Sequence, residues 1–583
     1  MRAATDRRLR LLTAVVLFGF AAVVGRAVQV QVVDARSLAA RAVSQQQTTQ
    51  PVPPTRGTIY SADGKALALE VPALTIVANP RLLGNPAATA SRLADLLGYT
   101  VPPVVRAPRH KLLAHMPRKQ RRALLKFVAK RTARVRDRRR TRRAELAVLD
   151  QALTAKGTFS YIARQLTPQR ADRVTAAKLP GISAIEENRR WYPYHTLASQ
   201  LLGFTTIDGS AGSGEGGGLE NMLNRYLAGT PGLQETVTDP TGQQLETVTL
   251  RRMRPGRNVR LTIDTSIQAE VQTVMAQTEH KWRARSATAI VLDPRNGAVL
   301  AMASAPTFDP NSVHQLTTGA FDRLTPNLAT NMVYDPGSTY KVVTFSAALD
   351  NHIITPNEMF RNIPYSIQLG GRTIHDDAFR GPVNYTAAEI LRYSSNIGTI
   401  KIAQMVGPTL LENWIHRYGF GRTSALRFPG ESPGIVLPLK QWSGSSIGNI
   451  PIGQGISVTA IQMAAAYQAV ANGGVMVEPH VVAGIQGRRT PQPWRRRILP
   501  AGIDHELVKM LEGVVDLGTG TQAKIPGYVV AGKTGTAQKV DPRTGAYSNS
   551  AYVASFVGFL PAMHPRVEII VVVDTPHGNY FGG

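Results

Sequence analysis

The segment Ser338-Thr339-Tyr340-Lys341 places a hydroxyl and an amine at a spacing that suits nucleophilic catalysis. Pro336-Gly337 precedes it, and an apolar-periodic helix is predicted over residues 340–350, so Ser338 is expected at a helix N-terminus. Backbone amide groups there favour developing negative charge. Because residues three apart share a helix face, the Lys341 amine is expected within reach of the Ser338 hydroxyl. Only a neutral amine can take that proton, and partial burial and a second cation nearby favour the neutral form.

Two later motifs supply the other groups that such a reaction needs. Lys533 follows the apolar run 529–532 and is expected to project from a strand bordering the cleft, as the second cation. Gly535 lets a substrate backbone approach closely, and the amide of Thr536 is expected to share an oxyanion hole with the Ser338 amide. The segment Ser394-Ser395-Asn396 fits a loop between two helices, where Ser394 relays a proton and Asn396 anchors an amide.

Each motif alone occurs by chance in many proteins of this length. Their order and setting together predict one acyl-transfer site. The predicted catalytic residues are Ser338, Lys341, Ser394, Asn396 and Lys533, and the predicted substrate-binding residues are Thr534, Gly535 and Thr536.

The elements around these motifs predict an α+β fold, one antiparallel sheet flanked by helices. A boundary is expected near Pro255-Gly256, followed by a strand at 259–263 and a helix at 266–278. Apolar runs at 287–292 and 298–303 are joined by turn-forming residues and predict a hairpin. Further helices are predicted at 340–350, 387–392 and 461–471, and further strands at 529–531, 551–559 and 567–573.

The region before that boundary is predicted to be rich in β structure. A hairpin is expected at 58–60 and 66–69 around the turn dipeptide Asp63-Gly64, with another strand at 74–78. Residues 166–179 have a helical pattern, and 209–218 form a glycine-rich loop.

The N-terminus has the pattern of a segment that enters a membrane. Four arginines precede an apolar run at 11–24, and the positive end is expected to stay in the cytoplasm. The run is shorter than the roughly twenty residues of a typical span, so a cleaved signal peptide also fits. We favour an uncleaved single-pass anchor at 11–33, because apolar residues continue the helix. Either interpretation exports the rest of the chain.

The formal net charge of +28 is concentrated in one block. Residues 106–143 hold seventeen Lys and Arg and a single acidic residue, Asp137. Such a block is most often a solvated helix or flexible segment, although interleaved apolar residues also allow an amphipathic helix on an anionic lipid surface. Nucleic acid is disfavoured as a partner because the block is exported. The chain has no cysteine, which excludes disulfides and thiolate chemistry.

The three motifs resemble the active-site motifs of class B penicillin-binding proteins. The wider segments 334–341 and 453–459 resemble the family's sequences around the nucleophile and between the second and third motifs. Residues 56–60, 180–182 and 218–220 resemble the family's pedestal motifs. The similarity covers nearly the whole chain except the basic block.

This resemblance implies a peptidoglycan D,D-transpeptidase, of division type rather than elongation type. Ser338 would attack the carbonyl of a D-Ala-D-Ala stem peptide, release the terminal D-Ala and pass the acyl group to an amine on a neighbouring stem. Lys533 and Thr534 would hold the substrate carboxylate, and β-lactams would acylate the same serine. The implied partners are a polytopic membrane glycosyltransferase and other cell-wall synthesis proteins.

The expected organisation is a cytoplasmic tail at 1–10, an anchor at 11–33, an elongated dimerisation-type pedestal at 34–255 and a transpeptidase domain at 256–583. The last is expected to have the fold of penicillin-binding transpeptidases and serine β-lactamases, on the extracytoplasmic side of the cytoplasmic membrane. Two departures from the family are expected. The basic block at about 106–143 resembles an insertion in the pedestal, and the transpeptidase domain is expected to be truncated at its C-terminus.

Four other functions remain open from the residues. A serine β-lactamase needs a base that holds a deacylating water, and none is identified, whereas a D,D-carboxypeptidase differs only in its acceptor. A non-enzymatic membrane β-lactam receptor needs more than ten residues before the apolar run, and a nucleic-acid-binding protein rests on charge alone. No cofactor or metal is implied, since His375 beside Asp376 and Asp377 has no second histidine at ligand spacing and is interpreted as a solvated turn.

Overall fold

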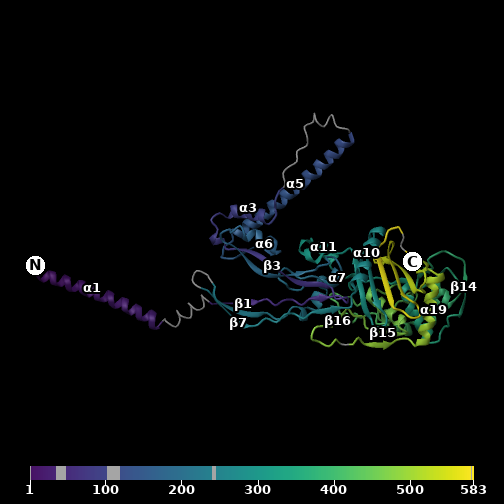
Figure 1. Ribbon diagram of the computed structural model, residues 1–583. Coiled ribbons are helices and arrows are strands. Elements are labelled where there is room, and N and C mark those ends of the chain that lie inside the picture. Colours follow the sequence, from purple (N-terminus) through teal and green to yellow (C-terminus); the bar gives the residue numbers. More distant parts are fainter. Residues whose placement is uncertain are drawn as a thin grey trace. The chain divides into compact units, whose positions relative to one another are not determined.

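The computed structural model describes residues 2–33, 47–101, 118–238, 244–490, 492–541, 543–578 and 581–582. The chain divides into two compact units (Figure 1). One consists of Met1–Arg56 and Ala228–Gly256, and the other of Gly57–Leu227 and Arg257–Gly583. All residues of the predicted acyl-transfer site belong to the second unit.

The first unit contains an apolar helix and a small sheet. Helix α1 (Arg2–Val28) continues into a π-helical turn, η1 (Gln29–Val33), and the stretch Leu11–Val32 is long and apolar enough to cross a membrane. Within the described residues, its large apolar side chains are exposed, such as Phe18 at 78%. This helix is a candidate for a single membrane anchor. Strands β1 (Gln47–Val52), β6 (Gly232–Thr238) and β7 (Gln244–Arg251) form an antiparallel sheet in that order.

The second unit begins with a six-stranded sheet that confirms the predicted hairpin. Strand β2 (Ile59–Tyr60) pairs with β3 (Ala66–Ala78). The order is β16-β8-β2-β3-β4, with β5 (Ile182–Trp191) also paired to β3; β16 is Val482–Ile485, β8 is Val259–Leu261 and β4 is Ser160–Leu166. The predicted separate strand at 74–78 is wrong, because β3 runs without a break and carries both β4 (Ser160–Leu166) and β5 along its length. The helix predicted at 166–179 is also shorter. Leu166 ends β4, and α6 (Pro168–Thr175) begins at a proline, which suits a first helical position.

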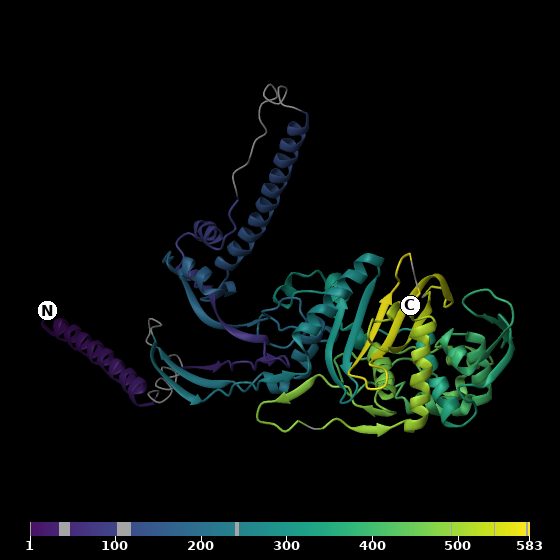
Figure 2. The same cartoon turned by 45° about the vertical axis from the view of Figure 1, so that its right-hand side comes forward.

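The basic block contains a long helix, α5 (Arg118–Leu153), that follows α3 (Pro86–Leu96) in the described chain (Figure 2). Leu149 and Leu153 near its end join Leu93 of α3 in a small apolar core. Arg142 donates to the Tyr99 carbonyl at 2.8 Å and to Asp95 at 2.5 Å, which attaches the base of α5 to the α3 region. Of the alternatives for the basic block, a helix or a flexible segment, the structure has a helix from residue 118 onward, and residues 106–117 lie outside the described chain.

The part of the second unit that holds the three motifs contains a five-stranded antiparallel sheet in the order β10-β9-β20-β19-β18. The hairpin of β9 (Ser286–Asp293) and β10 (Ala298–Ala305) is as predicted, and β19 (Tyr547–Leu560) and β20 (Val567–Asp574) extend the predicted strands. The strand predicted at 529–531 is displaced: β18 (Ala531–Val540) begins at its last residue, and Val529 is exposed. The third motif therefore lies within an edge strand.

Helices cover both faces of this sheet. Helix α10 (Thr265–Trp282) packs on one face over small alanines, among them Ala287 and Ala289. On the other face, Ile290 and Leu292 of the same strand join the main core with α13 (Lys341–Asp350) and α18 (Ala460–Ala471). The alternation of faces along β9 produces this sandwich of sheet between helices. The predicted α+β fold is confirmed.

The remaining described elements all belong to the second unit. They are η2 (Pro80–Leu82), α7 (Ser199–Leu202), η3 (Glu215–Gly217), α8 (Gly218–Met222), α9 (Asn224–Leu227), β8 (Val259–Leu261), η4 (Pro310–Gln315), α11 (Thr318–Leu324), α12 (Leu328–Asn331), η5 (Gly337–Tyr340), β11 (Met359–Ile363), β12 (Ser366–Leu369), β13 (Arg372–His375), β14 (Val383–Thr386), α14 (Ala387–Arg392), α15 (Asn396–Val406), α16 (Pro408–Arg417), η6 (Leu439–Gln441), α17 (Ser446–Asn449), η7 (Ile450–Ile452), β15 (Val475–Val477), β16 (Val482–Ile485), β17 (Arg495–Arg497), α19 (Ala501–Leu517) and η8 (Thr521–Ala523).

Candidate active site

Four of the predicted catalytic residues lie in one hydrogen-bonded cluster. The Lys341 Nζ, at the first residue of α13, donates to the Ser394 carbonyl at 2.6 Å, to Asn396 Oδ1 at 2.9 Å and to Ser394 Oγ at 3.3 Å. The Lys533 Nζ, from edge strand β18, donates to the same Ser394 Oγ at 3.0 Å. Two buried amines from different elements thus share one serine hydroxyl.

Ser338 lies one turn before Lys341, in the 3-10 turn η5 that leads into α13. Gly337 has φ +56°, and a Cβ there would lie 2.7 Å from the Thr536 carbonyl oxygen of β18. Its amide donates to the carbonyl of Gly453 at 2.9 Å. The nucleophile turn is therefore pressed against β18 on one side and the η7 segment on the other, which requires glycine at these contacts.

The predicted Ser338–Lys341 contact is not a hydrogen bond in the structure. Within the described part of the chain, the Ser338 hydroxyl has no hydrogen-bond partner, and the Lys341 amine is directed to Ser394 and Asn396. In enzymes without a bound substrate, catalytic hydrogen bonds are often long and close only in the complex. Ser338 is only 9% exposed, so its hydroxyl is largely shielded from solvent.

Burial lowers the proton affinity of both amines. Desolvation lowers the pKa of Lys341 to about 8, against the opposing effect of the Asp377 and Asp376 carboxylates. Burial and the neighbouring Lys341 charge hold the pKa of Lys533 well below its usual value. A neutral Lys341 near neutral pH is thus accessible, as proton acceptance requires.

Strand β18 offers an edge for an extended substrate. Only one side of β18 pairs within the sheet, with β19, so its other side faces the cluster and η5. A Cβ at Gly535 would lie 2.4 Å from Ser555 Oγ and 2.7 Å from the Pro336 carbonyl, which explains the glycine. The hydroxyl groups of Thr534 and Thr519 form a hydrogen bond of 2.8 Å. Thr536 Oγ1 accepts a hydrogen bond from the Gly582 amide at 3.2 Å.

A cavity of 330 Å³ adjoins the cluster. Its walls include the predicted site residues Asn396 and Thr536 together with Arg372, Asp377 and Tyr547. Tyr547 also donates to Asp335 at 2.8 Å, and Ser457 donates to the other Asp335 oxygen at 2.8 Å. Asp335 precedes Ser338 by three residues, and sequence reasoning did not identify this network because its members come from distant segments.

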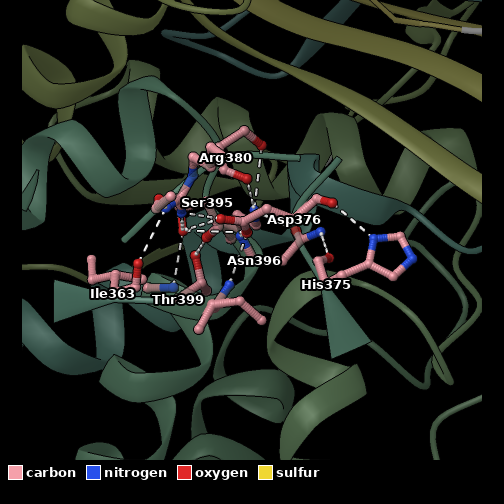
Figure 3. Close-up of polar contacts among 12 residues, drawn as sticks. Ile363, His375, Asp376, Arg380, Ser395, Asn396 and Thr399 are labelled. Carbon is pink, nitrogen blue, oxygen red and sulfur yellow. Dashed lines mark hydrogen bonds and ion pairs between the residues drawn. The ribbon is translucent and has the colours of Figure 1, made fainter. Parts of the chain in front are cut away.

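The second motif is supported by a loop that was also missed (Figure 3). Asp376, which follows β13, accepts hydrogen bonds from the Asn396 and Ile397 amides, and Arg380 pairs with it. The interpretation of His375 to Asp377 as a solvated turn is wrong for Asp376, whose side chain is buried because it caps a helix. His375 itself is exposed and stacks on Tyr365. Among described residues, no three His, Cys, Asp or Glu side chains are grouped as metal ligands.

Comparisons with known proteins match both halves of the chain. A family model of the penicillin-binding protein transpeptidase domain matches residues 287–583, and one of the penicillin-binding protein dimerisation domain matches residues 51–261. The chain is 33% identical to penicillin-binding protein PbpB of Mycobacterium tuberculosis, over 95% of this chain and 78% of that protein. It is 30% identical to the peptidoglycan D,D-transpeptidase FtsI of Escherichia coli, over 99% of this chain and 89% of that protein.

A solved structure agrees with these relatives. Penicillin-binding protein 3 from Mycobacterium tuberculosis, crystallised with aztreonam, superposes with a TM-score of 0.64 at 29% identity, covering 92% of this chain and 93% of the other. The two family models match in the order dimerisation domain, then transpeptidase domain. The alignments with the relatives and with the solved structure cover most of this chain. The chain therefore belongs to the class B penicillin-binding proteins, in which a dimerisation domain precedes a transpeptidase domain.

Proposed function

We propose that the chain is a septal peptidoglycan D,D-transpeptidase that cross-links stem peptides through an acyl-enzyme on Ser338. The observation that carries this proposal is that the buried amines of Lys341 and Lys533 both donate to the Ser394 hydroxyl. Lys341 lies one turn after Ser338. The relatives named peptidoglycan D,D-transpeptidase agree with it.

Acylation begins when Ser338 Oγ attacks the carbonyl carbon of the penultimate D-Ala. The hydroxyl proton passes to neutral Lys341, and the amides of Ser338 and Thr536 stabilise the oxyanion of the tetrahedral intermediate. The C–N bond then breaks, and the leaving amine of the terminal D-Ala takes a proton through Ser394, which bridges the two lysines. The free D-Ala departs and an ester remains on Ser338.

Substrate recognition falls to the third motif and to Asn396. The cation of Lys533, when protonated, and the Thr534 hydroxyl attract the terminal carboxylate, while the open side of β18 pairs with the extended stem. Gly535 lets β18 lie against the turn that carries Ser338, because a Cβ there would lie 2.7 Å from the Pro336 carbonyl oxygen. Asn396 holds a substrate amide and, through Oδ1, the Lys341 amine at 2.9 Å.

The second half-reaction transfers the acyl group to the amine of a neighbouring stem peptide. That amine loses its proton to Lys341, attacks the ester carbonyl and expels Ser338 Oγ, which is reprotonated. β-Lactams acylate Ser338 by the same attack, and the β-lactam amide C–N bond breaks. Slow hydrolysis of that ester is what separates a transpeptidase from a β-lactamase.

The candidate anchor and the family resemblance support a location and a partner for this reaction. We infer that α1 holds the chain in the cytoplasmic membrane, with residues 1–10 inside and the catalytic domain on the extracytoplasmic side. The proposed division is a pedestal at 34–255 and a transpeptidase domain at 256–583. A polytopic membrane glycosyltransferase is the proposed partner that supplies glycan strands.

The first test is covalent labelling by a fluorescent penicillin, followed by intact-mass analysis of full-length protein in detergent. The wild type is expected to gain one label and release it slowly, Ser338→Ala to lose labelling and Lys341→Ala to label far more slowly. Ser346→Ala, a matched serine on α13 that bonds Tyr418 and not the cluster, is expected to label normally. The proposal is contradicted if the folded wild type takes no label. It is also contradicted if Ser338→Ala takes as much label as the wild type.

A further inference from the structure

Asp376 lies outside all three motifs yet makes direct hydrogen bonds to the second. Its Oδ1 accepts the backbone amides of Asn396 at 2.6 Å and Ile397 at 3.1 Å. Its Oδ2 accepts the Ser395 hydroxyl at 3.1 Å (Figure 3). The residue is 5% exposed, and it comes from a loop twenty positions earlier in the chain.

These bonds cap helix α15 from outside. The first amides of a helix have no partner within it and favour a negative group. Here the Asp376 carboxylate accepts hydrogen bonds from the first two amides of α15. The Ser395 hydroxyl accepts a hydrogen bond from the Gly398 amide at 3.0 Å. Asn396, the first residue of α15, is therefore fixed in position by a group that does not belong to its own segment.

The residue that precedes this cap is conformationally strained. Ser394 has φ +59°, a left-handed conformation that costs a side-chain-bearing residue energy. That conformation directs its carbonyl and hydroxyl to Lys341 and its hydroxyl to Lys533. On the N-terminal side of this turn, the Ser394 and Ser395 amides donate hydrogen bonds to carbonyls of α14. On its C-terminal side, Asp376 supplies the restraint.

Asp376 is itself held in place. Its amide donates to the Tyr365 carbonyl at 3.0 Å. Arg380 forms an ion pair with its carboxylate and donates to the Ile363 carbonyl at 3.2 Å. The carboxylate is thus oriented before substrate arrives, as a supporting residue of a precise site must be.

We infer that Asp376 is a positioning residue, which holds Ser394 and Asn396 in register with Lys341 by capping α15 and is itself oriented by Arg380. This inference rests on the proposed acyl transfer at Ser338. Asp376 touches neither Ser338 nor substrate. It acts through the second motif, and its loss should slow acylation without weakening the initial binding of a β-lactam.

Its neighbour provides a matched control. The Lys341 amine faces Lys533 from β18 and the two carboxylates, Asp376 and Asp377, from the loop after β13. Both carboxylates raise the pKa of Lys341. Asp377, however, is exposed and makes no hydrogen bond to the second motif in the described structure. Removing either charge lowers the pKa of Lys341, but only removing Asp376 disturbs the geometry.

The experiment measures acylation of full-length protein by a fluorescent penicillin from pH 6 to 10. Saturation curves separate the initial dissociation constant from the limiting acylation rate. For Asp376→Ala we expect the plateau rate to fall about 10- to 100-fold with the dissociation constant changed less than about threefold. For Asp377→Asn, which removes a charge near Lys341 but no hydrogen bond to the second motif, we expect the acidic limb to move to lower pH and the plateau rate to fall less than in Asp376→Ala. Asp376→Asn keeps an acceptor for the two amides and should be intermediate.

The outcomes are distinguishable from a failure of the proposed function. A wild type without a label on Ser338 removes the proposed function, whereas a labelled wild type with an equal plateau rate in Asp376→Ala overturns only the inference about Asp376. Should circular dichroism show Asp376→Ala unfolded, Asp376→Asn and Arg380→Met decide. A lowered plateau in both supports the inference, and a wild-type plateau in either overturns it.

Discussion

Replacing Gly453 by alanine should inactivate the nucleophile turn. Gly453 has φ +77°, and a Cβ built there would lie 2.1 Å from the carbonyl oxygen of Gly337, the residue before Ser338. Its own carbonyl accepts the Gly337 amide at 2.9 Å. Non-bonded carbon–oxygen contacts need more than about 3 Å, so one of the two segments must move by roughly 1 Å.

The size of the effect follows from these two strains. A left-handed conformation costs an alanine about 1–2 kcal/mol, and overpacking in a well-filled interior adds about 1–3 kcal/mol. We expect the free energy of unfolding to fall by about 2–5 kcal/mol. A displacement of roughly 1 Å at a nucleophile lowers a rate by about 100-fold, so acylation should nearly cease in the protein that remains folded.

The assay compares penicillin acylation rates and thermal unfolding in Gly453→Ala and in a control, Gly209→Ala. Gly209 has φ +76°, but a Cβ there meets no atom within 4 Å. The control therefore carries the backbone strain alone and should lose about 1–2 kcal/mol of stability with a normal acylation rate. Equal acylation rates in Gly453→Ala and the wild type would refute the packing argument.

Three further predictions concern charge. The acylation rate should rise roughly fivefold from pH 7 to pH 8, because neutral Lys341 is the proposed base and its pKa is about 8; a flat profile in stopped-flow measurements would contradict this. Arg190→Ala leaves the buried Glu220 carboxylate without its 2.7 Å guanidinium partner and should cost about 3–5 kcal/mol in denaturant unfolding, whereas Arg543→Ala, in an exposed pair, should cost under about 1 kcal/mol. A fragment without the anchor should co-sediment with anionic but not neutral vesicles, and less so after the exposed arginines of α5 at 138–140 are changed to glutamine; indifference to lipid charge would exclude this surface.

Local chemistry explains why much of the site could be predicted. Ser338 and Lys341 lie one helical turn apart, so their spacing alone predicts that they share a face. Ser394 and Asn396 lie at the junction of α14 and α15, as the helical patterns on either side indicate. The three motifs meet because the fold brings their elements together, which their order and setting predict and periodicity alone does not.

Where tertiary pairing overrides the local pattern, the sequence predictions are wrong. Strand β3 continues through Pro72, because β5 pairs with it from Leu69 to Ala78 and β4 from Leu74 to Ala78. Strand β18 starts two residues later than the apolar run predicts, since Val529 is exposed and Ala531 is the first residue paired with β19. Hydrophobicity marks the region in each case, but the partner strand sets the bounds.

The residues that orient the site are the hardest to predict, for a physical reason. Asp376 reaches Asn396 across twenty positions, and Tyr547 reaches Asp335 across 212. Neither spacing corresponds to the repeat of a helix or a strand. An aspartate in a polar turn is normally exposed to solvent. What changes its role is the set of unpaired amides at the start of α15 and the left-handed turn at Ser394, features that exist only once the chain has folded. The reacting groups can be identified by residue type, whereas the groups that align them are defined by the backbone atoms they contact.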